Sequence, residues 1–187
     1  MKIAAISSSL FVLMLVQSAF AQTLPSKIRG YKVYDAKVVV TNKTDTGYKD
    51  TDADAAVKLT NFKLAGMGLS GVIVEVGAYI LSENKSGDVE FMTFHNFRVN
   101  GVAIDVEEYK QPFSFKKTES VSLPKPARIT IKPSSLAKGA AKELTDPQKD
   151  WIVTGTVYVF GKFKKFGFSF KRVVPVKIDI KIKNLLQ

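Results

Sequence analysis

Apolar and polar residues alternate along residues 174–182, near the carboxy terminus, and this pattern constrains the fold more than any other. The even positions are all valine or isoleucine, and Lys177, Asp179 and Lys181 stand between them. Successive residues of a β-strand point to opposite faces, so a period of two sends one set to a core and the other to water. β-Branched side chains favour strands further. The segment therefore predicts a long, half-buried β-strand packed against an opposing sheet.

Further strands are predicted along the rest of the chain, where apolar residues alternate or form short β-branched runs. They lie at about residues 31–40, 55–64, 72–81, 91–99, 102–106, 113–115, 127–131, 151–160 and 166–172. Asn100-Gly101 supplies the two positive-φ residues of a type I′ turn and predicts a hairpin between its neighbours. Pro124 and Pro126 indicate a sheet edge or a crossing between sheets. So many short strands predict an all-β fold.

One helix is predicted after residue 133, where the period changes. Leu136, Ala140 and Leu144 would share one face of a helix, and a serine at 134 or 135 can cap it. The prediction is a short helix at about residues 134–145. Its apolar stripe is narrow, so we expect it to pack on the sheet rather than enter a membrane.

Residues 1–21 have the pattern of a secretory signal peptide. Lys2 gives a positive start, residues 10–16 form an apolar run, and Ala19-Phe20-Ala21 is a small-x-small cleavage sequence. The apolar run is too short to span a bilayer comfortably. We therefore expect cleavage after Ala21 and a periplasmic or secreted protein.

The mature chain, residues 22–187, is long enough to form one folded unit with its own core. Within it we expect an N-terminal strand and acidic loop at 22–54, followed by a β-sandwich domain at 55–187. The sequence has no cysteine, so no disulfide scaffold is expected. Asn42 and Asn84 begin glycosylation sequons in predicted loops, which would matter only in a eukaryotic secretory pathway.

The chain is strongly basic, with a formal net charge of +11, of which the signal peptide holds only Lys2. Such a balance favours anionic partners such as phospholipid head groups, surface polysaccharide, acidic proteins or nucleic acid. It equally well describes a soluble, self-repelling surface. Residues 161–187 alone hold eight Lys/Arg and one Asp, so much of the charge gathers near the carboxy terminus.

Lysines and phenylalanines are interleaved where the last two predicted strands meet. Lysines beside exposed rings suit a membrane interface, where the charge meets head groups and the ring enters the acyl boundary. They also suit stacking on single-stranded nucleic acid, although we expect no nucleic-acid partner. Alternatively, the rings face the core and the lysines protect a sheet edge against aggregation. The candidate contacts with an anionic surface or ligand are Lys162, Phe163, Lys164, Lys165, Phe166, Lys171 and Arg172.

The residues that could perform catalysis or bind a cofactor lack the context that such chemistry needs. Gly66, Gly68 and Gly71 spell the glycine pattern of dinucleotide-binding folds, but a strand follows where a helix is required, so we expect a turn or bulge. The single His95 has neither a cysteine nor a nucleophile-elbow serine as partner, and we interpret it as structural or exposed. The acidic residues 50–54 lack the later glycine and glutamate of a calcium loop. We therefore expect no catalytic residue, metal or cofactor.

A series of short segments also carries a family resemblance. It begins with Val57-Lys-Leu-Thr-Asn-Phe-Lys-Leu, Leu69-Ser-Gly-Val-Ile-Val-Glu-Val, the loop Ser82-Glu-Asn-Lys-Ser-Gly and the Asn100-Gly101 hairpin. It continues with Ala127-Arg-Ile-Thr-Ile, the predicted helix, Asp150-Trp-Ile-Val-Thr-Gly-Thr-Val and Val174-Pro-Val-Lys-Ile-Asp-Ile. In this order the chain resembles the late embryogenesis abundant proteins of group 2, which include the water-stress and hypersensitive-response domain. The family usually has Asn-Pro in the loop after its second strand, whereas Asn84 is followed here by Lys85.

The resemblance, which covers about residues 55–183, implies both a fold and a function. The implied fold is an antiparallel, immunoglobulin- or fibronectin-like β-sandwich of about seven or more strands with one short helix. The implied protein has no enzymatic activity and takes part in protection under desiccation, cold or salt. Exported bacterial members exist, in keeping with the signal peptide.

Two functions follow as expectations. The first is a non-catalytic, exported stress-protective protein of the envelope, whose basic face makes weak contact with client proteins or anionic surfaces. The second is a periplasmic carrier or binding module for a lipid or other amphipathic ligand, held between the sheets or under the lysine- and phenylalanine-rich segment. A filled, dry interior would favour the first function, and a hollow one the second.

Overall fold

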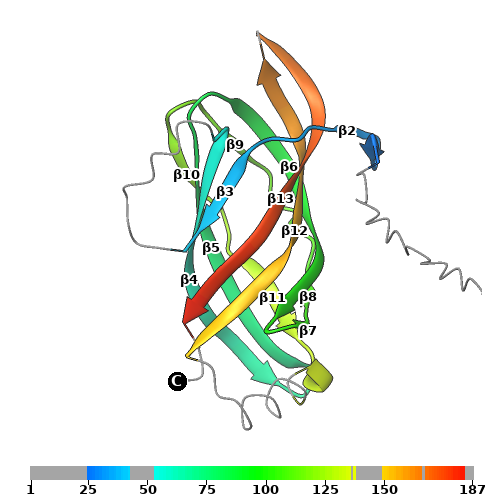
Figure 1. Cartoon of the computed structure of the whole chain (residues 1–187), viewed down its shortest axis with the longest axis vertical. Helices are drawn as coiled ribbons and strands as arrows, with labels where there is room; N and C mark the ends of the chain where they lie inside the picture. The colour runs from blue at the N-terminus through cyan, green and yellow to red at the C-terminus, as the bar shows by residue number, and fades with distance from the viewer. Residues whose placement is uncertain (1–24, 43–52, 136, 138–148, 166, 184–187) are drawn as a thin grey trace, which may run out of the picture.

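The structure, a computed structural model, describes residues 25–42, 53–135, 137, 149–165 and 167–183. In this part of the chain, strands form two stacked sheets (Figure 1). The strands are β1 (Lys27–Ile28), β2 (Tyr31–Val33), β3 (Val38–Thr41), β4 (Ala55–Gly68), β5 (Gly71–Ser82), β6 (Ser86–Val99), β7 (Val102–Ala103), β8 (Asp105–Val106), β9 (Phe113–Phe115), β10 (Ser120–Ser122), β11 (Ala127–Ile131), β12 (Asp150–Lys165) and β13 (Phe168–Lys183).

The first sheet has the order β1-β2-β13-β12-β6-β7, with β9 also paired to β6. The second has the order β3-β4-β5-β11-β8, with β10 also paired to β5. The predicted all-β sandwich is therefore confirmed. Its strand order does not make it specifically immunoglobulin-like, and two of its pairs, β2 with β13 and β3 with β4, are parallel rather than antiparallel.

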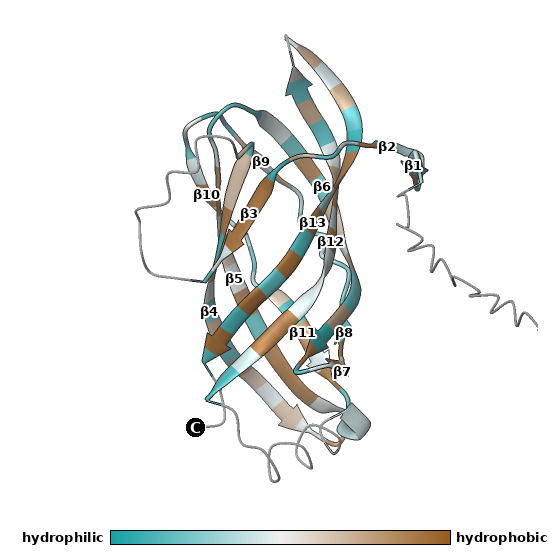
Figure 2. Ribbon diagram, viewed as in Figure 1, coloured by the Kyte–Doolittle hydropathy of each residue, from teal (hydrophilic) through white to brown (hydrophobic). Residues whose placement is uncertain are grey.

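The alternation along residues 174–182 places the apolar side chains in the core and the charged ones in solvent, as predicted. The five even-numbered aliphatic residues are each 6–7% exposed and face the second sheet, whereas Lys177, Asp179 and Lys181 are exposed. Hydrophobic and hydrophilic bands alternate along β13 in Figure 2. The predicted half-buried strand is confirmed, and its partner along the whole length is β12.

The hairpin of β12 and β13 is longer than predicted. We expected arms at 151–160 and 166–172 with a tip at 162–166, but β12 runs on to Lys165 and β13 runs unbroken from Phe168 to Lys183. Pro175 is tolerated inside β13 because β2, the neighbour on that side, makes its last pair two residues earlier, between Val33 and Val173. Residues 162–165 are thus paired with β13 instead of forming a loop.

Two predicted strands are broken by crossings between the sheets. Residues 31–40 divide into β2 in the first sheet and β3 in the second, and residues 102–106 divide at Ile104 into β7 and β8. The prediction of one continuous strand in each place was wrong. A chain that changes sheets can keep an extended backbone, so the alternation continues through the crossing.

The turn predictions are confirmed. Asn100 and Gly101 have φ angles of 48° and 81°, as a type I′ turn between β6 and β7 requires. Gly68 is paired with Gly71, so the glycine motif forms a hairpin turn between β4 and β5. At Gly71, φ is 123°, and an added Cβ would lie 2.1 Å from the carbonyl oxygen of Ile131.

Most of the helix predicted at 134–145 lies outside the described residues. Residues 133–135 and 137 are helical, which agrees with a helix start at this position. None of the helical residues that the structure describes belongs to a helix long and apolar enough to cross a membrane.

The outer face of the first sheet has a small aromatic cluster of its own. Phe160 of β12 is fully buried, with its ring stacked on Phe91 at 4.5 Å between centroids. Tyr31 packs edge-on against Phe160 at 5.2 Å, and its hydroxyl donates a hydrogen bond to Glu90. This bond raises the pKa of Tyr31. The segment β1–β2 therefore covers apolar surface on the side of the sheet away from the sandwich core.

Candidate ligand-binding cavity

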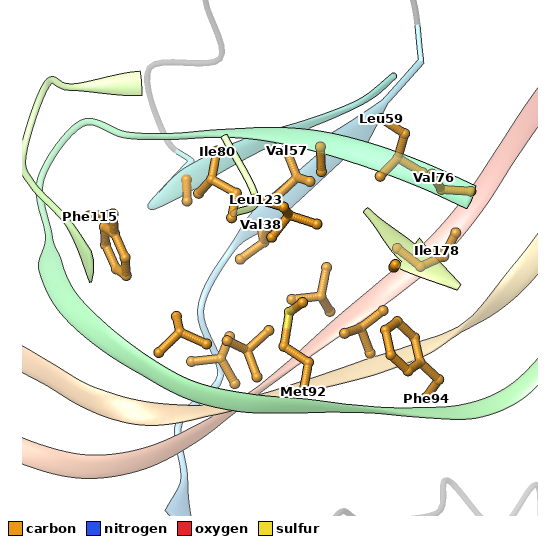
Figure 3. Close-up of a pocket in the computed structure, with 18 of the residues that line it drawn as sticks. Val38, Val57, Leu59, Val76, Ile80, Met92, Phe94, Phe115, Leu123 and Ile178 are labelled. Carbon is orange, nitrogen blue, oxygen red and sulfur yellow. The ribbon is translucent and has the colours of Figure 1, made fainter. Parts of the chain in front are cut away.

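A cavity of about 190 Å³ lies between the two sheets. Its walls come from the inner faces of both, with Val57, Val76 and Ile80 on one side and Met92, Phe94 and Ile178 on the other. Figure 3 shows these side chains pointing toward one another, with only carbon and sulfur atoms facing the space. For comparison, an engineered apolar cavity of about 150 Å³ stays dry and binds benzene.

Short side chains from both sheets line the cavity. Two stacked sheets lie about 10 Å apart, and side chains must interdigitate to fill the gap. Val57, Ala78 and Val176 are too short to reach across it, and all three line the cavity. Two clusters of buried apolar side chains are found among the described residues, one around β13 and one around Val89 and Phe113, and partly buried residues such as Phe94 and Val157 pack against both.

The polar residues that line the cavity gather at one end of it, at its rim. They are Tyr34, Asp54, Ser82 and Lys85. The Nζ of Lys85 lies 2.7 Å from the Tyr34 hydroxyl and 3.3 Å from Oδ1 of Asp54. The side chains of Lys85 and Asp54 are 24% and 28% exposed, so they touch both the cavity and solvent.

Backbone contacts hold this rim in place. Asp54 Oδ2 accepts a hydrogen bond from the N–H of Lys37 at 3.2 Å. The buried hydroxyl of Ser82 donates to the carbonyl of Asp54 and accepts from the N–H of Lys85, both at 3.2 Å. The rim thus joins the end of β5, the start of β4 and the crossing segment after β2.

The electrostatics of the rim keep Lys85 charged. Its hydrogen bond to the Tyr34 hydroxyl raises the pKa of Lys85 above the usual 10.5, and Asp54 acts in the same direction, while partial burial opposes both. An ammonium with such neighbours is protonated at neutral pH. The cavity therefore combines an apolar interior with the Lys85–Asp54 ion pair and the Tyr34 hydroxyl at its rim.

Of the seven candidate residues from the sequence, the five whose side chains the structure describes lie on two faces of the hairpin. Residues directly opposite on paired strands share a face, and Lys162 is paired with Lys171 on the outer face, where Lys164 is also exposed. Phe163 is on the inner face, half-buried, and lines the cavity. Arg172 is also on the inner face. The side chain of Lys165 and the whole of Phe166 lie outside the described residues.

Among the described residues of the hairpin, two exposed phenylalanines were not in the candidate set. Phe168 and Phe170 are 68% and 39% exposed, on the same inner face as Phe163. The guanidinium of Arg172 lies 5.2 Å from the Phe170 ring centroid. Figure 1 shows why these rings are exposed, since the end of the hairpin extends past the second sheet. We call the described residues 162–165 and 167–171 the hairpin tip.

The interpretation of His95 as structural or exposed is confirmed. Its side chain is exposed, with its ring 5.0 Å from that of Tyr158. Within the described ranges, no group of three or more His, Cys, Asp or Glu side chains could hold a metal ion. There, too, each buried side-chain nitrogen or oxygen has a hydrogen-bond partner.

Sequence reasoning missed Tyr34, Asp54 and Lys85. Each comes from a different segment, and their sequence separations are large, so no local motif links them. The available signal was weak: Lys85 lies in a short loop between two strongly alternating strands, where loop residues commonly bind ligands.

Two solved structures are distantly similar to this chain. No family model and no curated protein matches the chain. A crystal structure of a protein from Archaeoglobus fulgidus is similar, with 15% identity over 69% of this chain and 97% of that chain, and a TM-score of 0.39. The solution structure of a putative late embryogenesis abundant protein has 11% identity over 70% of this chain and 72% of that chain, with a TM-score of 0.30. At these TM-scores neither likeness carries an argument about function, so membership of the group 2 family stays a prediction.

Proposed function

We propose that the protein is a non-catalytic binding protein that holds the apolar chain of an amphipathic ligand between its two sheets. The observation that supports this most is the apolar cavity of about 190 Å³. Water is poorly stabilised in a space whose walls offer almost no hydrogen-bond partners. An apolar chain therefore displaces it at little cost in free energy. A hollow interior favours this carrier function over a purely protective surface protein.

The size of the cavity limits the affinity that an apolar chain can supply. Judged against benzene, about six carbon atoms fit in a cavity of this order. Burying each methylene contributes about 0.8 kcal/mol, so six contribute about 5 kcal/mol. That corresponds to a Kd on the order of 0.1–1 mM before the entropy of ordering the chain is subtracted. Tighter binding needs either a longer buried chain or polar contacts at the rim.

A cavity-filling substitution tests this proposal. Ala78 of β5 is buried and lines the cavity, so Ala78→Leu should occupy the space that the ligand needs. We expect about a tenfold loss of affinity for a ten-carbon amphiphile, with equal or higher stability against urea. The matched control is Ala103→Leu, at an exposed position of β7, which should leave affinity unchanged.

Native mass spectrometry of the purified protein gives an independent measurement, because a carrier retains part of its ligand. We expect an additional mass that is lost on mild activation and absent from Ala78→Leu. A wild-type protein that binds no amphiphile in titration, or an Ala78→Leu variant that binds as tightly as wild type, would rule out the carrier.

A second candidate function is protection under stress, as in the group 2 family, through contact of the hairpin tip with client proteins or anionic surfaces. The observation that favours it is the tip itself, with Lys162, Lys164 and Lys171 on one face and the exposed Phe168 and Phe170 on the other. Charge and exposed rings together suit weak, salt-sensitive contacts.

A freeze–thaw assay tests protection. The purified protein should preserve a labile enzyme better than albumin does at equal mass concentration. Lys164→Glu at the tip should weaken the effect, while Lys177→Glu, at an exposed position in the middle of β13, should not. Equal protection by albumin would remove this second candidate.

We also propose that the protein is exported, on the pattern of residues 1–21. The intact mass of the protein from an envelope or medium fraction should correspond to a chain that begins at Gln22. A full-length chain found only in the cytoplasm would contradict export.

A further inference from the structure

We propose that the cavity takes a ligand with a singly charged anionic head group, a carboxylate, which Lys85 and Tyr34 bind at the rim. This inference rests on the proposed carrier function and adds the chemical class of the ligand. The polar side chains lining the cavity all gather at this rim, so an amphiphile whose chain enters the cavity places its head group among them.

Two hydrogen-bond donors remain at the rim for a ligand. The ammonium of Lys85 has three N–H groups, and the contacts with Tyr34 and Asp54 use two of them. The Tyr34 hydroxyl accepts from Lys85, so its own O–H is left to donate. A carboxylate has two acceptor oxygens on one carbon and can take both donors, with the charge-assisted bond to the ammonium as the stronger one.

The donors are positioned before any ligand arrives. Asp54 is held by the backbone of Lys37, and Ser82 joins the backbones of Asp54 and Lys85. Lys85 is therefore held between Asp54 and Tyr34, and less rotamer freedom is lost when a ligand binds. A single preorganised lysine can therefore add affinity for a ligand whose apolar chain binds only weakly by itself.

Asp54 determines which anion fits. Its carboxylate lies 3.3 Å from the ammonium and repels any negative charge on the ligand, so it penalises a dianion more than a monoanion. A monoanionic carboxylate is therefore favoured over a phosphate monoester dianion. A neutral alcohol loses the charge-assisted bond, so we expect it to bind about tenfold more weakly than the carboxylate.

Calorimetric titration with decanoate, 1-decanol and decyl phosphate tests the inference, at low salt and below the concentrations at which these compounds aggregate. Wild type should bind decanoate about tenfold more tightly than decanol, with decyl phosphate between them. Lys85→Met should lower decanoate affinity about tenfold and leave decanol affinity unchanged, and Lys85→Arg should recover part of the loss. The matched control, Lys177→Met on the outer face of β13, should bind like wild type.

Asp54→Asn separates binding of the head group from a structural role of the Lys85–Asp54 pair. If Lys85 binds the ligand, removing the competing charge keeps or raises decanoate affinity and brings decyl phosphate closer to decanoate. If the pair only supports the rim, Asp54→Asn and Lys85→Met weaken decanoate and decanol alike, which overturns the inference. Equal binding of decanoate and decanol by wild type also overturns it but leaves the carrier function intact. Failure of all three probes to bind would rule out both the carboxylate inference and the carrier function.

Discussion

The two ends of β13 have the same alternation but different surroundings. From residue 174 to 182, the inner-face side chains are covered by the second sheet and are 6–7% exposed, whereas Phe168 and Phe170, on the same face, are 68% and 39% exposed. The difference is the partner, because the hairpin tip extends past the second sheet (Figure 1). Alternation therefore specifies which face of a strand is apolar, and the opposing sheet decides whether that face is core or surface. The cavity lies between these extremes, on an inner face that is covered but incompletely filled.

The largest effect should come from comparing two phenylalanines of the β12–β13 hairpin. Phe160 is fully buried under Tyr31 and against Phe91, so Phe160→Ala should lower the free energy of unfolding by about 3–5 kcal/mol. Phe170→Ala, at the exposed tip, should cost less than about 1 kcal/mol. Urea denaturation with an unchanged m-value measures both. Equal losses would mean that the tip is part of the folded core.

A smaller effect is expected at two glycines, Gly155 of β12 and Gly66 of β4, which report how tightly their surroundings are packed. A Cβ on Gly155 of β12 would lie 2.6–2.8 Å from three ring atoms of Phe97, whereas on Gly66 of β4 the nearest atom would be 4.0 Å away. Gly155→Ala should therefore cost about 1–3 kcal/mol, since the buried ring must shift. Gly66→Ala should remain within about 0.5 kcal/mol of wild type. Thermal unfolding of both variants checks this, and a neutral Gly155→Ala would show that the Phe97 ring has room to move.

The exposed rings of the tip should contribute more to binding of anionic membrane surfaces than to the free energy of unfolding. The double variant Phe168→Ala and Phe170→Ala should lower partitioning onto anionic vesicles about tenfold, because the rings supply the apolar part of an interfacial contact. Leu69→Ala, an exposed apolar residue in the β4–β5 turn, is the matched control. Vesicle sedimentation at low and high salt measures the effect. If Leu69→Ala and the double variant bind alike, the tip is not the contact surface.

The fold was largely predictable because the strands follow a strong local rule. Even-numbered aliphatics in β13 and the Asn100-Gly101 turn act through side-chain direction and φ preference, both of which are properties of a few neighbouring residues. The crossings at 34–37 and at Ile104 have no such signal, since the extended backbone continues through them. The parallel pairings of β2 and β3 depend on the crossing at 34–37 and were therefore missed with it.

The candidate site was less predictable, for two physical reasons. The division of the hairpin tip into two faces depends on register, which sets Lys162 opposite Lys171 on one side and Phe163 opposite Phe170 on the other. The rim depends on tertiary contact alone, because Tyr34, Asp54 and Lys85 come from three separate segments. Composition could show an excess of lysine, but it could not distinguish one lysine beside an apolar cavity from its exposed counterparts.

The smallest expected effect is on how the free energy of unfolding changes with pH. It is compared between a variant of Lys85 at the rim and a variant of the exposed Lys177. The folded pKa of Lys85 is raised above 10.5, first by Tyr34 and then by Asp54, so its contribution is fully present below pH 10.5. The contribution is lost as the pH rises through the folded pKa. For this partly exposed group we expect Lys85→Met to cost about 0.5–1 kcal/mol at pH 7 to 9, and the difference from wild type to shrink above pH 10.5. Lys177→Met, at an exposed position of β13, is the matched control and should cost less at pH 7 to 9. Urea midpoints across the range measure it, and a Lys85→Met penalty that grows with pH would contradict the assigned ion pair.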